Sequence, residues 1–131
     1  MRLQQDILPA AGGLPCERGV HNGSMLMDGL LLKIYIAESA TIEGRPAYKY
    51  LVDYFKRKGF PGCTVLRGMA GFGHESVIHT VDVLRLSLDL PITLEVVDEE
   101  ERILAVLPEI EKFVEHGQII LQKVTMIRKS P

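Results

Sequence analysis

The stretch that decides the fold is residues 62–73, GCTVLRGMAGFG. Its first part alternates between two faces, which predicts a strand, and its end is a glycine-rich turn, Gly71-Phe72-Gly73. The next strand-like run starts only at Pro91. Because a hairpin joins two strands with about 2 to 5 residues, a link of about 20 residues has the length typical of functional loops.

Further elements are predicted on both sides of this stretch. Residues 30–37 are a short apolar run, typical of a strand that is covered on both faces. Residues 45–59 predict a helix, because proline stands in the first turn, apolar residues recur at helical spacing and a basic turn precedes Gly59. Residues 91–97 predict a strand that begins with proline, and residues 118–127 predict the last strand.

A second helix is predicted over residues 98–117. Asp98 and Glu101 have the spacing of an N-cap and its capping box, and an apolar stripe follows them as far as Gly117. Pro108 lies inside this segment and lacks the amide hydrogen that a helix uses. The segment therefore predicts a helix that is kinked or split at Pro108.

The element order over residues 30–127 is β-α-β-β-α-β. This order predicts an α+β, ferredoxin-like sandwich, with a four-stranded antiparallel sheet and both helices on one face. The other face of the sheet then lacks a cover, although the strands are apolar on both faces. We therefore expect self-association through the open face, in a closed cyclic oligomer.

Composition and charge exclude several classes of protein. Hydrophobic residues make up 47% and charged residues 24% of the 131, which is typical of one folded domain. Fifteen Lys and Arg residues against 17 Asp and Glu residues leave a net charge of -2, so nucleic-acid binding is disfavoured. The apolar runs fall far short of the roughly 20 residues that span a bilayer, so direct membrane insertion is not expected.

The chain divides into a tail and a domain. Residues 1–24 carry two prolines and four glycines without a sustained period, which predicts an irregular N-terminal tail ahead of a domain over residues 25–131. The tail lacks a continuous apolar segment of signal-peptide length, which disfavours export. Cys16 and Cys63 lie far apart and outside any Cys/His cluster, so we predict a cytoplasmic protein without a disulfide scaffold or a structural zinc site.

Candidate functional residues are concentrated in the link after the glycine turn. The glycines let backbone N–H groups approach an anion, as in phosphate-binding nests, although an ordinary turn or bulge uses the same residues. His74 and His79 miss the i, i+4 spacing of a helical metal pair, so polar loop contacts are favoured over a metal site. His79 and Arg85 suit contact with a ligand or a partner. The sequence has no nucleophile motif, so no catalytic residue is predicted.

Several segments together resemble the family called domain of unknown function 190. The resemblance extends from about Leu30 to Ile127, and the tail before Met25 lies outside it. The stretches that carry it are LKIYIAES, GRPAYKYLVDYFKRKGFPG, GCTVLRGMAGFG, IHT, LRLSLDLP and ITLEVVDEEERI. Each is weak alone, and together they are specific.

The family looks like the nitrogen-regulatory PII proteins. These are ferredoxin-like trimers that bind adenine nucleotides in clefts between subunits and signal through a long loop. The resemblance implies a PII-like homotrimer without enzymatic activity or an essential cofactor, whose signalling loop is residues 72–90. Two features depart from PII proteins: Glu115–Gln118 lacks their glycine-rich loop with a lysine, and His74 and Glu75 stand where they carry a glutamine that helps hold magnesium. AMP, or else ADP, is therefore expected as the ligand rather than magnesium-bound ATP.

The expected nucleotide site combines the loop base with nearby candidate cations. Its residues are Gly71, Phe72, Gly73, His74, Arg67, Lys123 and Arg128, and the loop residues expected to contact a partner are His79 and Arg85. The resemblance implies a membrane transport or channel protein as that partner. Two other functions stay open: an interaction protein that needs no small ligand, and a trimer that handles divalent metal ions.

Overall fold

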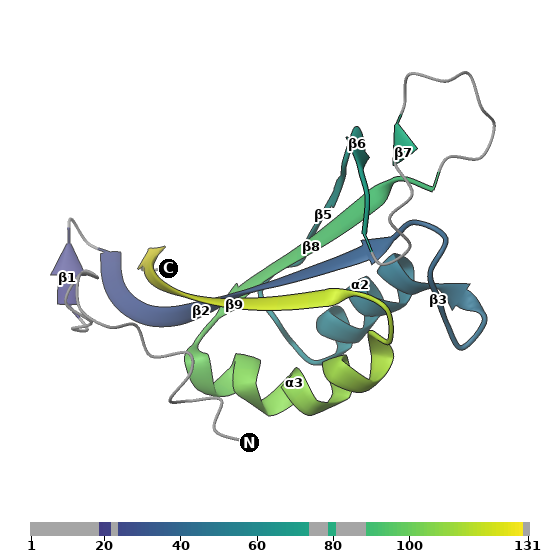
Figure 1. Ribbon diagram of the computed structural model, residues 1–131. Coiled ribbons are helices and arrows are strands. Elements are labelled where there is room, and N and C mark those ends of the chain that lie inside the picture. Colours follow the sequence, from purple (N-terminus) through teal and green to yellow (C-terminus); the bar gives the residue numbers. More distant parts are fainter. Residues whose placement is uncertain (1–18, 22–23, 74–78, 81–88, 130–131) are drawn as a thin grey trace.

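The computed structural model describes residues 19–21, 24–73, 79–80 and 89–129. Its principal elements follow the predicted β-α-β-β-α-β order (Figure 1). They are β2 (Ser24–Ala37), α2 (Ala47–Arg57), β5 (Thr64–Arg67), β8 (Pro91–Asp98), α3 (Glu100–Phe113) and β9 (Gln118–Lys129). Short strands accompany them: β1 (Gly19–His21), β3 (Thr41–Ile42), β4 (Arg45–Pro46), β6 (Ala70–Gly71) and β7 (His79–Thr80).

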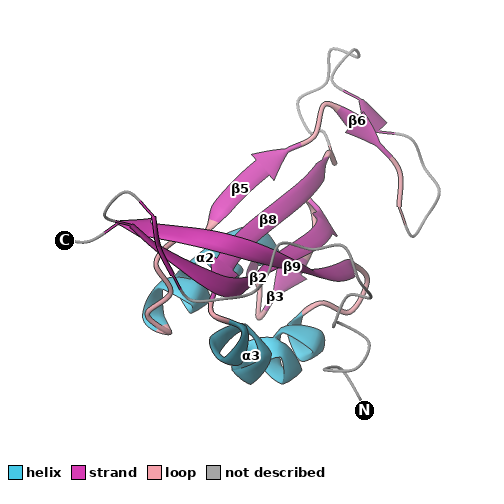
Figure 2. Ribbon diagram, turned by 90° about the vertical axis from the view of Figure 1, so that its left-hand side faces the viewer, coloured by secondary structure: helices cyan, strands magenta, loops and turns pink. Residues whose placement is uncertain are grey.

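The four principal strands form one antiparallel sheet in the order β9-β2-β8-β5. The first principal strand, β2, pairs along its second half with β8 and along most of its length with β9, so β2 and β8 are the central strands. Both helices lie against the same face of the sheet (Figures 1 and 2). The predicted ferredoxin-like α+β fold is therefore confirmed.

Alternation along the strands builds the core under the helices. Along β8, every second side chain from Ile92 to Asp98 is buried, and β2 alternates in the same way over Leu30–Ile36. The helices add fully buried side chains from their apolar stripes, among them Leu51, Phe55, Ile103, Leu107 and Ile110. Within the described part of the chain, neither helix is long and apolar enough to cross a membrane.

The strand β2 begins at Ser24. The sequence predicts its start at Leu30, six residues later. Asp28 and Gly29 interrupt the apolar pattern, so the start cannot be found from hydropathy alone. The end of β9 holds these residues in register, with Ser24 opposite Lys129. Within the segment predicted to be an irregular tail, Gly19–His21 is a strand that pairs with the start of β2, and residues 1–18 lie outside the described residues.

The predicted N-cap role of Asp98 is wrong. Asp98 is the last residue of β8, and α3 starts after Glu99, which makes no side-chain cap hydrogen bond. The predicted capping box with Glu101 is therefore absent from this helix start. The reason is tertiary: the Asp98 side chain is 1% exposed and its carboxylate is held by two arginines.

Two other boundaries differ from the prediction. The second helix ends at Phe113 rather than Gly117, and it is continuous through Pro108, so it is not split. The strand predicted over residues 62–73 leaves the sheet after Arg67. At that point the backbone N–H of Gly68 donates to the carbonyl oxygen of Pro91 (2.7 Å), and the following residues pair with β7 instead.

Candidate functional site

A hollow of about 760 Å³ lies where the glycine turn meets the ends of the central strands. We call it the loop-base hollow. Four segments far apart in the sequence form its walls: the end of β2, the turn after β6, the start of β8 and the turn between α3 and β9. The lining residues are Tyr35, Ile36, Ala37, Ser39, Gly71, Phe72, Gly73, Asp89, Pro91, Glu115, His116, Gly117 and Gln118.

Glycines shape this hollow in different ways. A Cβ atom on Gly117 would lie 2.5 Å from the carbonyl oxygen of Tyr35, so only glycine lets the turn between α3 and β9 approach the end of β2. A Cβ atom on Gly71 would lie 3.1 Å from Cγ of Pro91, which is a tight contact. A Cβ atom on Gly73 would meet nothing within 4 Å, so this residue faces open space. A side chain at residue 73 would therefore extend into that space without straining the fold.

Carboxylates tie the start of β8 to the end of β2. The backbone N–H of Ser39 donates to Oδ1 of Asp89 (2.8 Å). Oε1 of Glu38 accepts from the backbone N–H of Leu90 (3.4 Å) and from Nη2 of Arg67 (3.0 Å). Arg67, a predicted phosphate contact, is therefore beside the hollow and paired with Glu38.

The charge of the described lining is acidic. Asp89 and Glu115 contribute carboxylates, whereas no Lys or Arg lines the hollow in the described part of the chain. Two aromatic rings complete the lining: Phe72, whose residue surface is 70% exposed, and Tyr35, which is 36% exposed. The hollow can thus offer aromatic faces, carboxylate acceptors and the backbone N–H groups of a glycine turn.

Two predicted site residues lie away from the hollow within one copy of the chain. Lys123 is midway along the edge strand β9, opposite Leu30. Arg128 lies near the far end of β9, where its Nη2 atom is 3.4 Å from Oδ1 of Asp98. Since Pro91 lines the hollow and Asp98 ends the same strand, Arg128 and the hollow are at opposite ends of the sheet.

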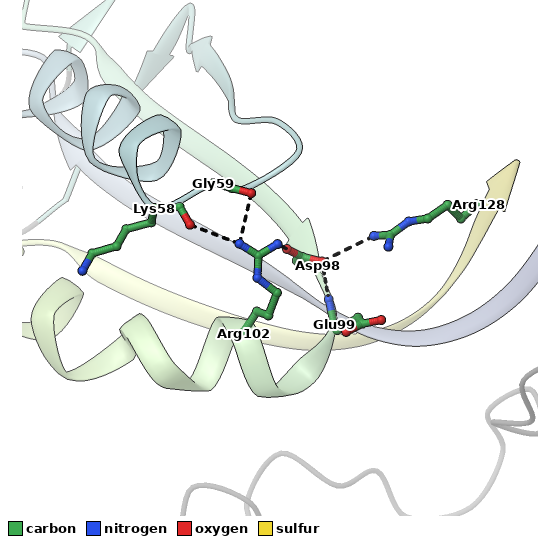
Figure 3. A network of polar contacts seen from close by, with 6 residues as sticks. All are labelled: Lys58, Gly59, Asp98, Glu99, Arg102 and Arg128. Carbon is green, nitrogen blue, oxygen red and sulfur yellow. Dashed lines mark hydrogen bonds and ion pairs between the residues drawn. The ribbon is translucent and has the colours of Figure 1, made fainter. Parts of the chain in front are cut away.

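Arg128 belongs to a group of polar contacts that we call the Asp98 network (Figure 3). Oδ1 of Asp98 also accepts from the backbone N–H of Glu99 (2.8 Å). Oδ2 lies 2.7 Å from Nη1 of Arg102, in an ion pair that lacks hydrogen-bond geometry. Nη2 of Arg102 donates to the carbonyl oxygens of Lys58 (3.1 Å) and Gly59 (3.0 Å). The network joins the ends of β8, β9 and α2 to the first turn of α3.

The remaining predicted residues fall wholly or partly outside the described residues. The predicted nucleotide contact His74 and the predicted partner contact Arg85 are both outside them. His79 is described by its backbone only, which pairs in β7 opposite Gly71. Among the described residues, no three His, Cys, Asp or Glu side chains gather in a way that could hold a metal ion.

Sequence reasoning missed much of the lining. Tyr35 lies in a strand predicted only as core, Ser39 follows that strand, and Asp89 lies in the link without a predicted role. The resemblance to PII proteins points to Glu115–Gln118, which all line the hollow. The local signal there is Gly117, which is predicted to end the second helix and is instead needed for a close backbone approach to Tyr35. These residues come together only after the sheet has formed, so periodicity could not find them.

The match to a family covers most of the domain. Residues 29–126 match the model of the family described as "Uncharacterized ACR, COG1993", the domain of unknown function 190. The chain belongs to this family. A "UPF0166 protein" of Aquifex aeolicus is 40% identical over 97 residues, which are 74% of this chain and 91% of the relative. A UPF0166 protein of Methanocaldococcus jannaschii is 38% identical over 91 residues, 70% of this chain and 83% of that one.

Solved structures similar to this family member have the PII-like fold. CPII of Thiomonas intermedia, a nitrogen regulatory PII-like protein bound to ADP, AMP and bicarbonate, matches with a TM-score of 0.61 and 19% identity, covering 77% of this chain and 90% of CPII. A putative PII-like signaling protein of Thermus thermophilus matches with a TM-score of 0.52 and 23% identity, covering 79% and 92%. The predicted PII-like fold is therefore confirmed.

Proposed function

We propose that this chain is a cytoplasmic, non-enzymatic signalling protein that binds an adenine nucleotide in the loop-base hollow, at the boundary between copies of a homotrimer. The observation that carries the proposal is the hollow itself, which forms at the glycine turn, with Phe72 and open space beside Gly73. The PII-like fold supports it, and so does the description of CPII as bound to ADP and AMP. AMP is the first ligand to test.

Each part of the nucleotide has a counterpart in the lining. The rings of Phe72 and Tyr35 suit an adenine, which stacks on aromatic faces. The carboxylates of Glu115 and Asp89 suit hydroxyl donors such as those of ribose. Backbone N–H groups of Gly71–Gly73, followed by His74, suit the phosphate.

The acidic lining disfavours a triphosphate. Every added phosphate brings negative charge toward Asp89 and Glu115, and no Lys or Arg of the described lining offsets it. In this proposal the cations come from outside the hollow: Arg67 when it releases Glu38, and Lys123 and Arg128 of a neighbouring copy. The site is therefore incomplete in one copy, and AMP or ADP is preferred over magnesium-bound ATP.

The loop over residues 72–90 carries the signal in this proposal, with His79 and Arg85 in contact with a target. The family resemblance alone suggests a membrane transport or channel protein as that target. No essential cofactor is required.

Thermal unfolding of the purified oligomer tests the nucleotide site. Melting temperatures are measured with AMP, ADP, ATP and cyclic AMP, each with and without magnesium. A ligand at 100 times its Kd stabilises the folded state by about 2.7 kcal/mol, so a selective shift identifies the nucleotide. The shift should disappear in Gly73→Val, whose side chain extends into the hollow. Gly62→Val is the matched control, because Gly62 also faces open space but lies outside the lining.

Other results would select a different function. Stability that ignores every nucleotide would overturn the proposal and favour an interaction protein that needs no ligand. Stability that falls with a chelator and returns with copper or zinc would favour a metal-handling trimer. Turnover of AMP or ATP that is lost in His74→Ala would show an enzyme.

A further inference from the structure

One side chain, that of Glu38, contacts the chain both before and after the loop over residues 72–90. Its Oε1 atom accepts from Nη2 of Arg67 (3.0 Å) and from the backbone N–H of Leu90 (3.4 Å). The backbone N–H of Glu38 donates to the carbonyl oxygen of Leu90 (3.0 Å), so Glu38 contacts both backbone polar groups of Leu90. Arg67 ends β5 and Leu90 precedes β8, and these two strands lie side by side (Figure 1). We call Glu38, Arg67 and Leu90 the Glu38 clamp.

The Glu38 clamp lies directly behind the wall of the loop-base hollow. The two sequence neighbours of Glu38 line the hollow, and so do the two neighbours of Leu90. A Cβ atom on Gly68, the residue after Arg67, would lie 2.7 Å from Cγ of Pro91, which also lines the hollow. Arg67 is therefore at the edge of the hollow, beside the site of the proposed ligand.

Arg67 is the member of the clamp that can leave it at little cost. Its side chain is 53% exposed, against 26% for the Glu38 side chain and 1% for Leu90. Exposed ion pairs contribute little to stability. A phosphate group binds arginine through two parallel charge-assisted hydrogen bonds, which are stronger than ordinary ones. A ligand that brings a phosphate can therefore take Arg67 from Glu38, whereas an uncharged ligand leaves the pair intact.

Departure of Arg67 would strengthen the hydrogen bond between Glu38 and Leu90. The two donors share one carboxylate oxygen, and the distance to the Leu90 nitrogen, 3.4 Å, is longer than the usual value of about 2.9–3.0 Å. The positive charge of Arg67 also offsets the negative charge of the carboxylate. Without Arg67, the whole charge of Glu38 acts on the Leu90 N–H, and charge-assisted hydrogen bonds are shorter and stronger.

We propose that Glu38 transmits the presence of a ligand phosphate to the residue that ends the loop. Arg67 turns from Glu38 to the phosphate, and Glu38 then binds the N–H of Leu90 more tightly. Glu38 is thus a positioning residue, because it acts on the ligand only through Arg67. This inference rests on the proposed function, and it names the side chain through which occupancy of the hollow changes the end of the loop.

Backbone amide hydrogen exchange at Leu90 tests this inference. The purified protein is saturated with AMP or with adenosine, which share the base and the ribose and differ in the phosphate. Exchange of the Leu90 amide should be at least about three-fold slower with AMP than with adenosine. The amide of Gly68, which donates to the carbonyl oxygen of Pro91 (2.7 Å), is the internal reference for any general gain in stability.

Variants of the ion pair separate this transmission from ligand binding. Arg67→Gln leaves Glu38 to Leu90 alone, so the Leu90 amide should exchange slowly without ligand and should not respond to AMP. Glu38→Gln removes the charge, so the Leu90 amide should exchange fast in every state, although AMP should bind at least as tightly because Arg67 is free. Arg45→Gln is the matched control: it breaks an ion pair of similar exposure, with Asp53 of α2, and should leave the response of Leu90 unchanged.

Circular dichroism shows whether each variant folds. If Glu38→Gln does not fold, Arg67→Gln decides, because Arg67 is half exposed. Equal exchange of the Leu90 amide with AMP and with adenosine, or a response to AMP that persists in Arg67→Gln, would overturn the inference.

Titration calorimetry distinguishes this inference from the proposed function. Binding of AMP to the wild type without a response of Leu90 would overturn the transmission alone and retain the nucleotide site. Absence of binding by every nucleotide would overturn both.

Discussion

The two ends of β8 differ in how their charges are satisfied. At Asp98 the buried carboxylate is paired with two arginines and a backbone N–H. At the other end, Asp89 and Glu115 line the loop-base hollow, and no Lys or Arg joins them there among the described residues. At the first end, arginines of the same chain offset the buried charge, which stabilises the fold. The second end keeps acceptors and open space available, which is what a binding site needs.

Removal of the Asp98 carboxylate should have the largest effect. Asp98→Ala deprives Arg102 and Arg128 of their shared partner and opens space in the core. We expect the free energy of unfolding to fall by about 3 kcal/mol. This value is at the lower end of the range for a broken buried ion pair, because both arginines can still reach water. Urea unfolding measures it. A loss below 1 kcal/mol would show that the Asp98 network is not the stabilising end.

A methyl group added to the wall of the hollow should have the second-largest effect on the free energy of unfolding. Gly117→Ala forces a Cβ atom against the carbonyl oxygen of Tyr35 and should lower the free energy of unfolding by about 2 kcal/mol. Gly73→Ala is the matched variant and should change it by less than about 0.5 kcal/mol, because its Cβ atom faces open space. Equal losses in urea unfolding would contradict this division of the hollow into packed and open parts.

A paired polar group in the helix layer should show a smaller effect that depends on pH. The hydroxyl of Tyr54 donates to Oε1 of Glu109 (3.0 Å), and burial together with this carboxylate raises the pKa of Tyr54 to about 12. Between pH 10 and 12 the unfolded tyrosine ionises first, so the free energy of unfolding falls as pH rises. Tyr54→Phe should lose about 1 kcal/mol at pH 8 and show a weaker decline.

Urea unfolding at pH 8, 10 and 11 measures this decline in the wild type and in Tyr54→Phe. A decline of the same steepness in Tyr54→Phe would show that Tyr54 is not its source. Tyr50→Phe is a comparison within the same helix: partial burial and Glu43 raise the pKa of Tyr50 as well, so this variant should also weaken the decline.

The smallest effect concerns charge in the hollow. Glu115→Gln removes one of the two lining carboxylates and keeps the size of the side chain. We expect about three-fold tighter binding of ADP and little change for adenosine, because only the former brings phosphate charge near this site. Titration calorimetry compares the two ligands. Equal tightening of both would show that Glu115 does not act through charge.

The sequence supported the order of elements and the core better than the site. The apolar stripes of α2 and α3 and the alternation of β8 are local patterns, so they predicted the helices, the strands and the face that each buries. Asp98 also has a local pattern, that of an N-cap, but Arg102 and Arg128 recruited it into a buried network. Its role depends on a residue 30 positions away, which no local rule contains.

By itself, the sequence determined the α+β class, the order of the strands and helices, and the glycine turn at the loop base. These follow from residue types and spacing over short stretches. Tertiary structure alone decided which residues meet: Tyr35, Asp89 and Glu115 at the hollow, and Glu38, Arg67 and Leu90 beside it. Pairing between strands brings together residues that are far apart in the chain, and the register that selects them is set by the whole sheet.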